Sequence, residues 1–163
     1  MGIKVGVVKK MPKNRKWEII GLSADKSLKI SARLALQQRL QSVTLAIKFF
    51  FEEETPENLH EIRIALRRLR YNMEIFISCF DKNKFIAFYQ IIEHLQDMTG
   101  TKRDLDILAE NIRNIDNGKI DSKTNSFLKK IEVKNNRFKD SLTLELMKFT
   151  HSKELKDFSK MLL

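Results

Sequence analysis

Residues 59–71 read LHEIRIALRRLRY and carry the clearest helical pattern in the chain. At 100° per residue the apolar side chains of this region share one face, which predicts a helix with that face buried in a core. These apolar residues are Ile62, Leu66, Leu69, Met73, Phe76 and Phe80. At one edge of that face lies a group within about 80° that we call the basic stripe: His60, Arg63, Arg67 and Arg70. Arg68 falls on another side of the helix.

The rest of the chain divides into helices at capping residues and glycines. Thr55-Pro56 predicts the start of the helix that holds the stripe, because threonine caps helices and proline fits the first helical position. The expected helices run from Ser23 to about Glu53, Pro56 to about Phe80, Asp81 to Gly100, Thr101 to Gly118, Asp121 or Ser122 to about Phe149, and Lys153 to Leu163. The expected fold is all-α, an antiparallel helical bundle of about five to six helices with short connections. The 5 Gly and 2 Pro are too few for the turns of a many-stranded sheet.

The composition points to a soluble protein with a polyanionic partner. The chain has 163 residues with 31 Lys+Arg against 21 Asp+Glu, a net charge of +10, which favours polyanions. Residues 1–22 hold six basic residues and one acid, so we expect a basic N-terminal arm there and a single helical domain over residues 23–163. The 1 Cys excludes an internal disulfide and fits a reducing, cytoplasmic location. No apolar run reaches the roughly 18 residues of a membrane span, so no membrane partner is expected.

The basic stripe itself has two interpretations from the residues alone. Like charges three and four residues apart repel by a few tenths of a kcal/mol, so helix stability gives no reason for the stripe. Arginine donates paired hydrogen bonds to phosphate or to carboxylate. The stripe therefore predicts either a bound polyanion or salt bridges to the acidic residues 81–118, where Asp104 and Asp106 are the candidates.

Two further groups of basic residues favour the anion site. In the predicted fifth helix, Lys130, Lys134 and Arg137 flank the core face, so two basic stripes on packed helices would line a shared groove. A solvated lysine face is the ordinary alternative for that helix. Lys102 and Arg103 lie at the predicted start of the fourth helix, where free backbone amides also attract anions.

The sequence resembles the CHAD domain, a helical domain named for its histidine. The resemblance rests on His60-x-x-Arg63-x3-Arg67-Arg68-Leu69-Arg70, followed by Gly100-x-x-Arg103-Asp104-x-Asp106, and covers roughly residues 25–118. It implies an all-helical domain that binds inorganic polyphosphate along a basic channel, and in some members an association with polyphosphate granules. The contacts that the resemblance implies are His60, Arg63, Arg67, Arg68, Arg70 and Arg103.

The chain departs from this family in one respect. Members usually contain two such bundles, each with its own motif, whereas the motif occurs here once. The chain is therefore expected to be either a half-length member or a fragment. Pairing of two copies as a homodimer is one way in which it would complete a channel.

Together these features predict non-catalytic binding of inorganic polyphosphate, without a cofactor or a metal. The expected contacts are His60, Arg63, Arg67, Arg68, Arg70, Lys102, Arg103, Lys130, Lys134 and Arg137. Nucleic acid is a less favoured partner, because the arginines border the core and few aromatic side chains are placed for base stacking. A helical interaction module that uses the arginines as structural salt bridges is the other alternative. Histidine phosphotransfer is least favoured, because Arg63 and Ile64 crowd His60.

Overall fold

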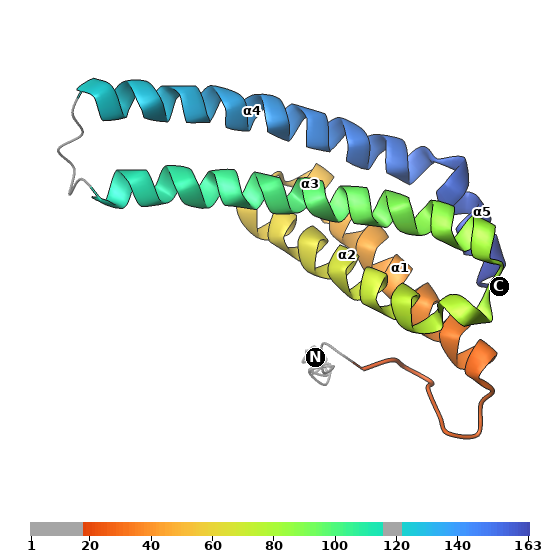
Figure 1. The fold of residues 1–163 in the computed structure, drawn as a ribbon. Helices are drawn as coiled ribbons and strands as arrows, with labels where there is room; N and C mark the ends of the chain where they lie inside the picture. The colour runs from red at the N-terminus through yellow and green to blue at the C-terminus, as the bar shows by residue number, and fades with distance from the viewer. Residues whose placement is uncertain (1–17, 116–121) are drawn as a thin grey trace, which may run out of the picture.

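The computed structural model describes residues 18–115 and 122–163, and within these ranges the protein is built from α-helices without a strand (Figure 1). The helices are α1 (Leu28–Glu52), α2 (Pro56–Phe76), α3 (Lys82–Ile115), α4 (Ser122–His151) and α5 (Lys153–Met161), with a 3₁₀ turn at Ile77–Cys79. The predicted all-α fold of about five to six helices is confirmed.

The helices form two antiparallel hairpins that pack on each other. The first hairpin is α1 with α2, and the second is α3 with α4. Helix α3 packs against α2 on one side and against α4 on the other, so it lies between them (Figure 1). The short α5 turns back and packs on α3. The far ends of α3 and α4 extend beyond the first hairpin (Figure 1).

One hydrophobic core joins all five helices. Leu36 of α1, Leu66 of α2, Ile92 of α3 and Leu142 of α4 are each 0% exposed. Phe158 of α5 closes the core by stacking on Phe88 of α3, with ring centroids 4.0 Å apart. Since burying one such side chain contributes about 1.5–3 kcal/mol, this core fixes which side of each helix faces outward.

Capping residues account for most of the helix boundaries. The Thr55 hydroxyl accepts a hydrogen bond from the Asn58 amide at 3.2 Å, and the Asp81 carboxylate accepts one from the Lys84 amide at 3.2 Å. Both predicted starts are confirmed. The first helix begins later than predicted, at Leu28, because Ser27 rather than Ser23 is its cap.

The segment before α1 is attached to that helix by a side-chain amide. Gln38 accepts a hydrogen bond from the Ile20 amide at 2.9 Å and donates one to the Ile20 carbonyl at 2.7 Å. Of the expected arm at residues 1–22, residues 1–17 lie outside the described residues.

The predicted break at Gly100 is wrong, because α3 runs without interruption from Lys82 to Ile115. Glycine inside a helix costs only about 1 kcal/mol relative to alanine. Residues on both sides of Gly100, such as Leu95 and Ala109, are buried in packing contacts, and this burial offsets that cost. The predicted end at Gly118 and the predicted start at Asp121 lie outside the described residues.

Candidate functional site

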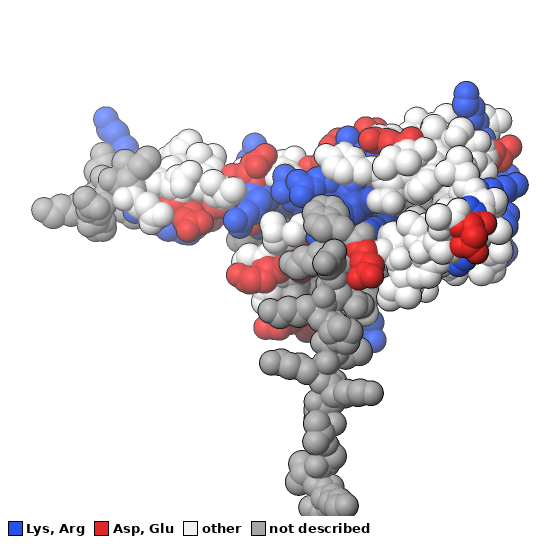
Figure 2. All heavy atoms as spheres, turned by 90° about the horizontal axis from the view of Figure 1, so that it is seen from below, with Lys and Arg blue, Asp and Glu red and all other residues white. Residues whose placement is uncertain are grey.

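The basic stripe lies on the side of α2 that faces α3. Ile62, Leu66 and Leu69 are completely buried, so the orientation of α2 about its axis is fixed by the core. That orientation leaves His60 and Arg67 exposed, and it leaves Arg63 and Arg70 half-buried. Seen from below, the molecule shows a cluster of Lys and Arg atoms near the middle of its surface, with Asp and Glu atoms around the cluster (Figure 2).

Carboxylates engage the Arg70 end of the stripe. The Nε atom of Arg70 lies 3.1 Å from Oε1 of Glu74, and its Nη1 atom lies 4.0 Å from Oε1 of Glu93 on α3. Burial lowers the pKa of Arg70, but the hydrogen bond to Glu74 and the attraction of Tyr89, Glu74 and Glu93 outweigh it, so the pKa is raised. The predicted salt-bridge partners Asp104 and Asp106 are not the ones that Arg70 uses.

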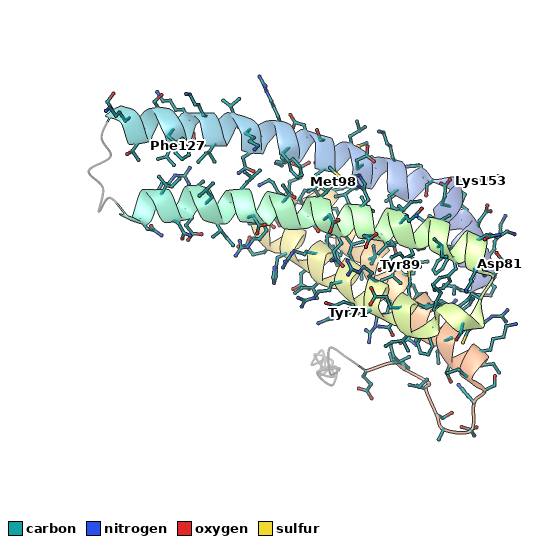
Figure 3. All side chains as sticks on the ribbon, in the orientation of Figure 1. Tyr71, Asp81, Tyr89, Met98, Phe127 and Lys153 are labelled. Carbon is teal, nitrogen blue, oxygen red and sulfur yellow. The ribbon has the colours of Figure 1, made fainter. Side chains whose placement is uncertain are left out.

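Tyr89 ties the same end to α3. Its hydroxyl donates a hydrogen bond to Oε1 of Glu74 at 2.8 Å, and Figure 3 shows the tyrosine on the side of α3 that faces α2. Burial, followed by the hydrogen bond to Glu74, raises the pKa of Tyr89. The Arg70 end of the stripe is therefore a closed polar network between α2 and α3.

The His60 end of the stripe is open and receives a further arginine from α3. A hollow of about 300 Å³ lies here, lined by Pro56, Glu57, Asn58, His60, Glu61 and Arg103. The structure thus brings together His60 and Arg103, which are 43 positions apart in the sequence. Both residues belong to the contact set that the resemblance implied.

The middle of the stripe keeps its hydrogen-bonding capacity. Among the described residues, none forms a hydrogen bond or an ion pair with His60, Arg63, Arg67 or Arg103. Three guanidinium groups with up to five N–H donors each can therefore bind a ligand without first breaking an internal pair.

Gly100 leaves open space on α3, on the side of the helix that carries Arg103. A Cβ atom built at Gly100 would have no atom within 4 Å, and a three-residue spacing puts Gly100 and Arg103 on the same side of the helix. Gly100 was expected to end a helix, so this open space beside Arg103 was not predicted. The signal was present in the spacing between the glycine and the arginine.

Lys102 does not reach the site, which corrects the prediction made from a helix start. It is 9% exposed and its Nζ atom lies 2.6 Å from Oδ1 of Asp106. Asn135 of α4 donates a hydrogen bond to the same carboxylate oxygen at 2.7 Å. Because α3 continues through this region, Lys102 faces α4, about 100° away from the direction of Arg103.

Arg68 lies on the other side of α2, where it contributes to a different hollow against α1. That hollow of about 330 Å³ is lined by Ser42, Leu45, Ala46, Phe49, Asn58, Glu61, Ile64, Ala65 and Arg68. The nearby Arg39 of α1 is 9% exposed, and burial followed by repulsion from Arg68 lowers the pKa of Arg39. Arg68, which the resemblance implied as a contact, therefore lies apart from the basic stripe.

The predicted second stripe lies on α4. Lys130, Lys134 and Arg137 are all exposed. None of them lines the hollow that holds His60 and Arg103. The α4 residue that reaches the start of α2 is instead Lys139, whose Nζ atom lies 2.6 Å from Oε2 of Glu54.

Comparisons with known proteins identify one similarity. A sequence model of the CHAD domain matches residues 9–113. No curated protein and no solved structure matches the chain significantly. Within residues 18–115 and 122–163, there is no group of three or more His, Cys, Asp or Glu placed to hold a metal ion. Across the same ranges, the helices are each too short or too polar to cross a membrane.

Proposed function

The chain belongs to the CHAD domain family, and we propose that it binds inorganic polyphosphate without catalysing a reaction. The family is associated with polyphosphate binding. The observation that carries the proposal for this chain is that His60 of α2 and Arg103 of α3 line one hollow, at the end of the helix edge that carries Arg63 and Arg67. None of them is engaged by a carboxylate of the described residues.

The chemistry of these side chains suits a chain of phosphates. Each planar guanidinium group donates two parallel hydrogen bonds to the oxygens of one phosphate. His60 adds a ring N–H donor at the open end of the stripe. Because Arg63 and Arg103 are half-buried, less side-chain entropy is lost when they bind than with fully exposed lysines.

The proposed contact set is narrower than the set expected from the sequence. It contains His60, Arg63, Arg67 and Arg103, with Arg70 available only if its two glutamates release it. Lys102 is excluded because it is buried against Asp106. Arg68 and the basic residues of α4 lie apart from the stripe, so we propose that they add long-range attraction at most.

Titration calorimetry with long-chain polyphosphate at physiological salt tests the proposal. Duplex DNA of similar charge is the competing ligand. We expect polyphosphate to bind more tightly than DNA, with an affinity that falls as salt rises, because counterions are released from the polyanion. Tighter binding of DNA would favour the nucleic-acid alternative. If neither ligand binds, the helical interaction module remains as the alternative function.

A matched pair of variants tests the site. Arg67→Ala removes an arginine of the stripe, and Lys156→Ala removes an exposed cation of α5 that the proposal does not use. We expect a loss of affinity of about tenfold for Arg67→Ala, as one charge-assisted contact is removed, and little change for Lys156→Ala. Equal losses would indicate diffuse attraction instead of a defined site.

The proposal extends to assembly and location. Two copies would pair to form a longer channel, and the protein would act in the cytoplasm, at polyphosphate granules. Light scattering with and without polyphosphate checks the first point, because a dimer doubles the measured mass. Fluorescence imaging of the tagged protein checks the second, and staining that ignores the granules would contradict it.

A further inference from the structure

Carboxylates flank the open part of the basic stripe at both ends. At the His60 end, Glu57 and Glu61 line the same hollow as His60 and Arg103. At the other end, Glu74 and Glu93 hold Arg70. Along α2, Arg63 and Arg67 lie between these two pairs of acids.

The open part of the stripe is short. From His60 to Arg67 there are seven residues of helix, which corresponds to about 10 Å along the axis. Three and four residues beyond Arg103 lie Asp106, a carboxylate held by Lys102 and Asn135, and Ile107, which is apolar and 37% exposed. A linear polyanion that continues past either end therefore meets carboxylates or an apolar side chain in place of donors.

The two ends do not exclude an anion in the same way. Glu74 accepts hydrogen bonds from both Arg70 and Tyr89, so the donors at that end are already used by the protein. Glu57 and Glu61 are exposed, and neither forms an ion pair with a described residue. Their carboxylates therefore lie beside His60 without a paired cation among the described residues, and they repel further phosphates.

We propose that these four glutamates set the length of ligand that the site recognises, so that it grips a short linear oligophosphate of a few phosphates. A longer chain would bind through an equally short segment, with its remainder outside the stripe. This inference rests on the proposed binding of polyphosphate. It adds specificity for length, with Glu57, Glu61, Glu74 and Glu93 as the determining residues.

The salt dependence of binding measures the number of phosphates that the protein contacts. For three or four cationic groups, the slope of log affinity against log salt is about 2 to 3 in magnitude. We expect the wild-type protein to give the same slope with tripolyphosphate and with chains many times longer. A slope that grows steadily with chain length would overturn the inference, whereas no binding at any length would refute the proposed function itself.

Removing the carboxylates supplies the second measurement. The variant Glu74→Gln/Glu93→Gln releases Arg70, so we expect the affinity for long chains to rise at least threefold and the slope to steepen. The affinity for tripolyphosphate, which the His60–Arg67 stretch already accommodates, should change less than twofold. Glu154→Gln makes the same charge change per residue on α5, away from the stripe, and serves as the control.

The opposite end gives an independent variant should the first one not fold. Glu57→Gln/Glu61→Gln changes two exposed carboxylates and leaves the Arg70 network intact. We expect its affinity for long chains to rise relative to its affinity for tripolyphosphate, as in the first variant. If all variants bind both ligands in the wild-type ratio, the glutamates do not set the length and the inference is wrong.

Discussion

The basic edge of α2 and the basic side of α4 hold similar charges in different surroundings. On α2, Arg63 is half-buried, and α3 supplies Arg103 to the hollow beside His60. On α4, Lys130 and Lys134 are exposed, and neither lines that hollow. The difference indicates that a row of cations at helical spacing is a candidate site only where a second helix adds donors beside it.

The glutamates around α2 sharpen this contrast. Arg70 belongs to the stripe by its position in the sequence, yet Glu74 and Glu93 make it part of the α2–α3 interface. Within one stripe, the structure thus separates arginines that can bind a ligand from one that holds two helices together.

The largest effect is expected from removing two arginines of the open stripe. Arg63→Ala/Arg67→Ala should weaken polyphosphate binding about 100-fold, because each lost charge-assisted contact contributes about 1.5 kcal/mol or more. Lys130→Ala/Lys134→Ala should weaken it less than about threefold, since exposed lysines give mainly screened attraction. Calorimetry on both variants at one salt concentration makes the comparison, and similar losses would erase the distinction between α2 and α4.

Two neighbours on α3 provide the next test. Lys102→Met should lower the free energy of unfolding by about 2 kcal/mol, because it leaves the Asp106 carboxylate without its cation. Binding should be retained. Arg103→Ala should do the reverse, with about tenfold weaker binding and a change in stability within about 0.5 kcal/mol. Urea unfolding together with calorimetry measures both quantities, and an exchange of the two outcomes would place Lys102 in the site.

Gly100 gives a smaller effect on stability. Gly100→Ala should raise the free energy of unfolding by about 1 kcal/mol, because alanine favours the helix and its methyl group has room. The melting temperature should rise by about 2–4 °C. Polyphosphate affinity should not change, whereas Gly100→Glu should reduce it by adding a negative charge beside Arg103. A destabilised Gly100→Ala variant would mean that the open space is filled.

The smallest effect is expected at Arg70. Arg70→Ala should weaken polyphosphate binding less than about threefold and lower stability by about 0.5 kcal/mol, the usual contribution of a partly exposed ion pair. The measurements are the same titration and urea unfolding. A loss as large as that of Arg67→Ala would show that the ligand displaces Glu74 and Glu93 and that the stripe works as one unit.

Helix positions and faces were largely predictable from the sequence. Thr55-Pro56 and Asp81 start helices where local hydrogen bonding requires it, and the apolar spacing of residues 59–71 identifies the buried face of α2. These features depend on residues three or four positions apart. Such interactions form within a single helix, whatever the rest of the chain does.

Other features depended on which helix packs against which. The sequence placed a break at Gly100, but packing of α3 against α2 and α4 keeps the helix continuous. For that reason Lys102 turns inward to Asp106, and Arg103 joins His60. The same packing brings Glu93 of α3 to Arg70. Glu74, four residues on in the same helix, already pairs with Arg70, and Arg67 has no such partner among the described residues.

The sequence by itself determined an all-α protein and a helix edge that carries His60 and three arginines, because a 3.6-residue period assigns each side chain to a face. Only the tertiary structure decided which of those cations form a site. Periodicity specifies the direction of a side chain on its own helix, but the neighbouring helix supplies the partners, the carboxylates and the open space that determine what the side chain can bind.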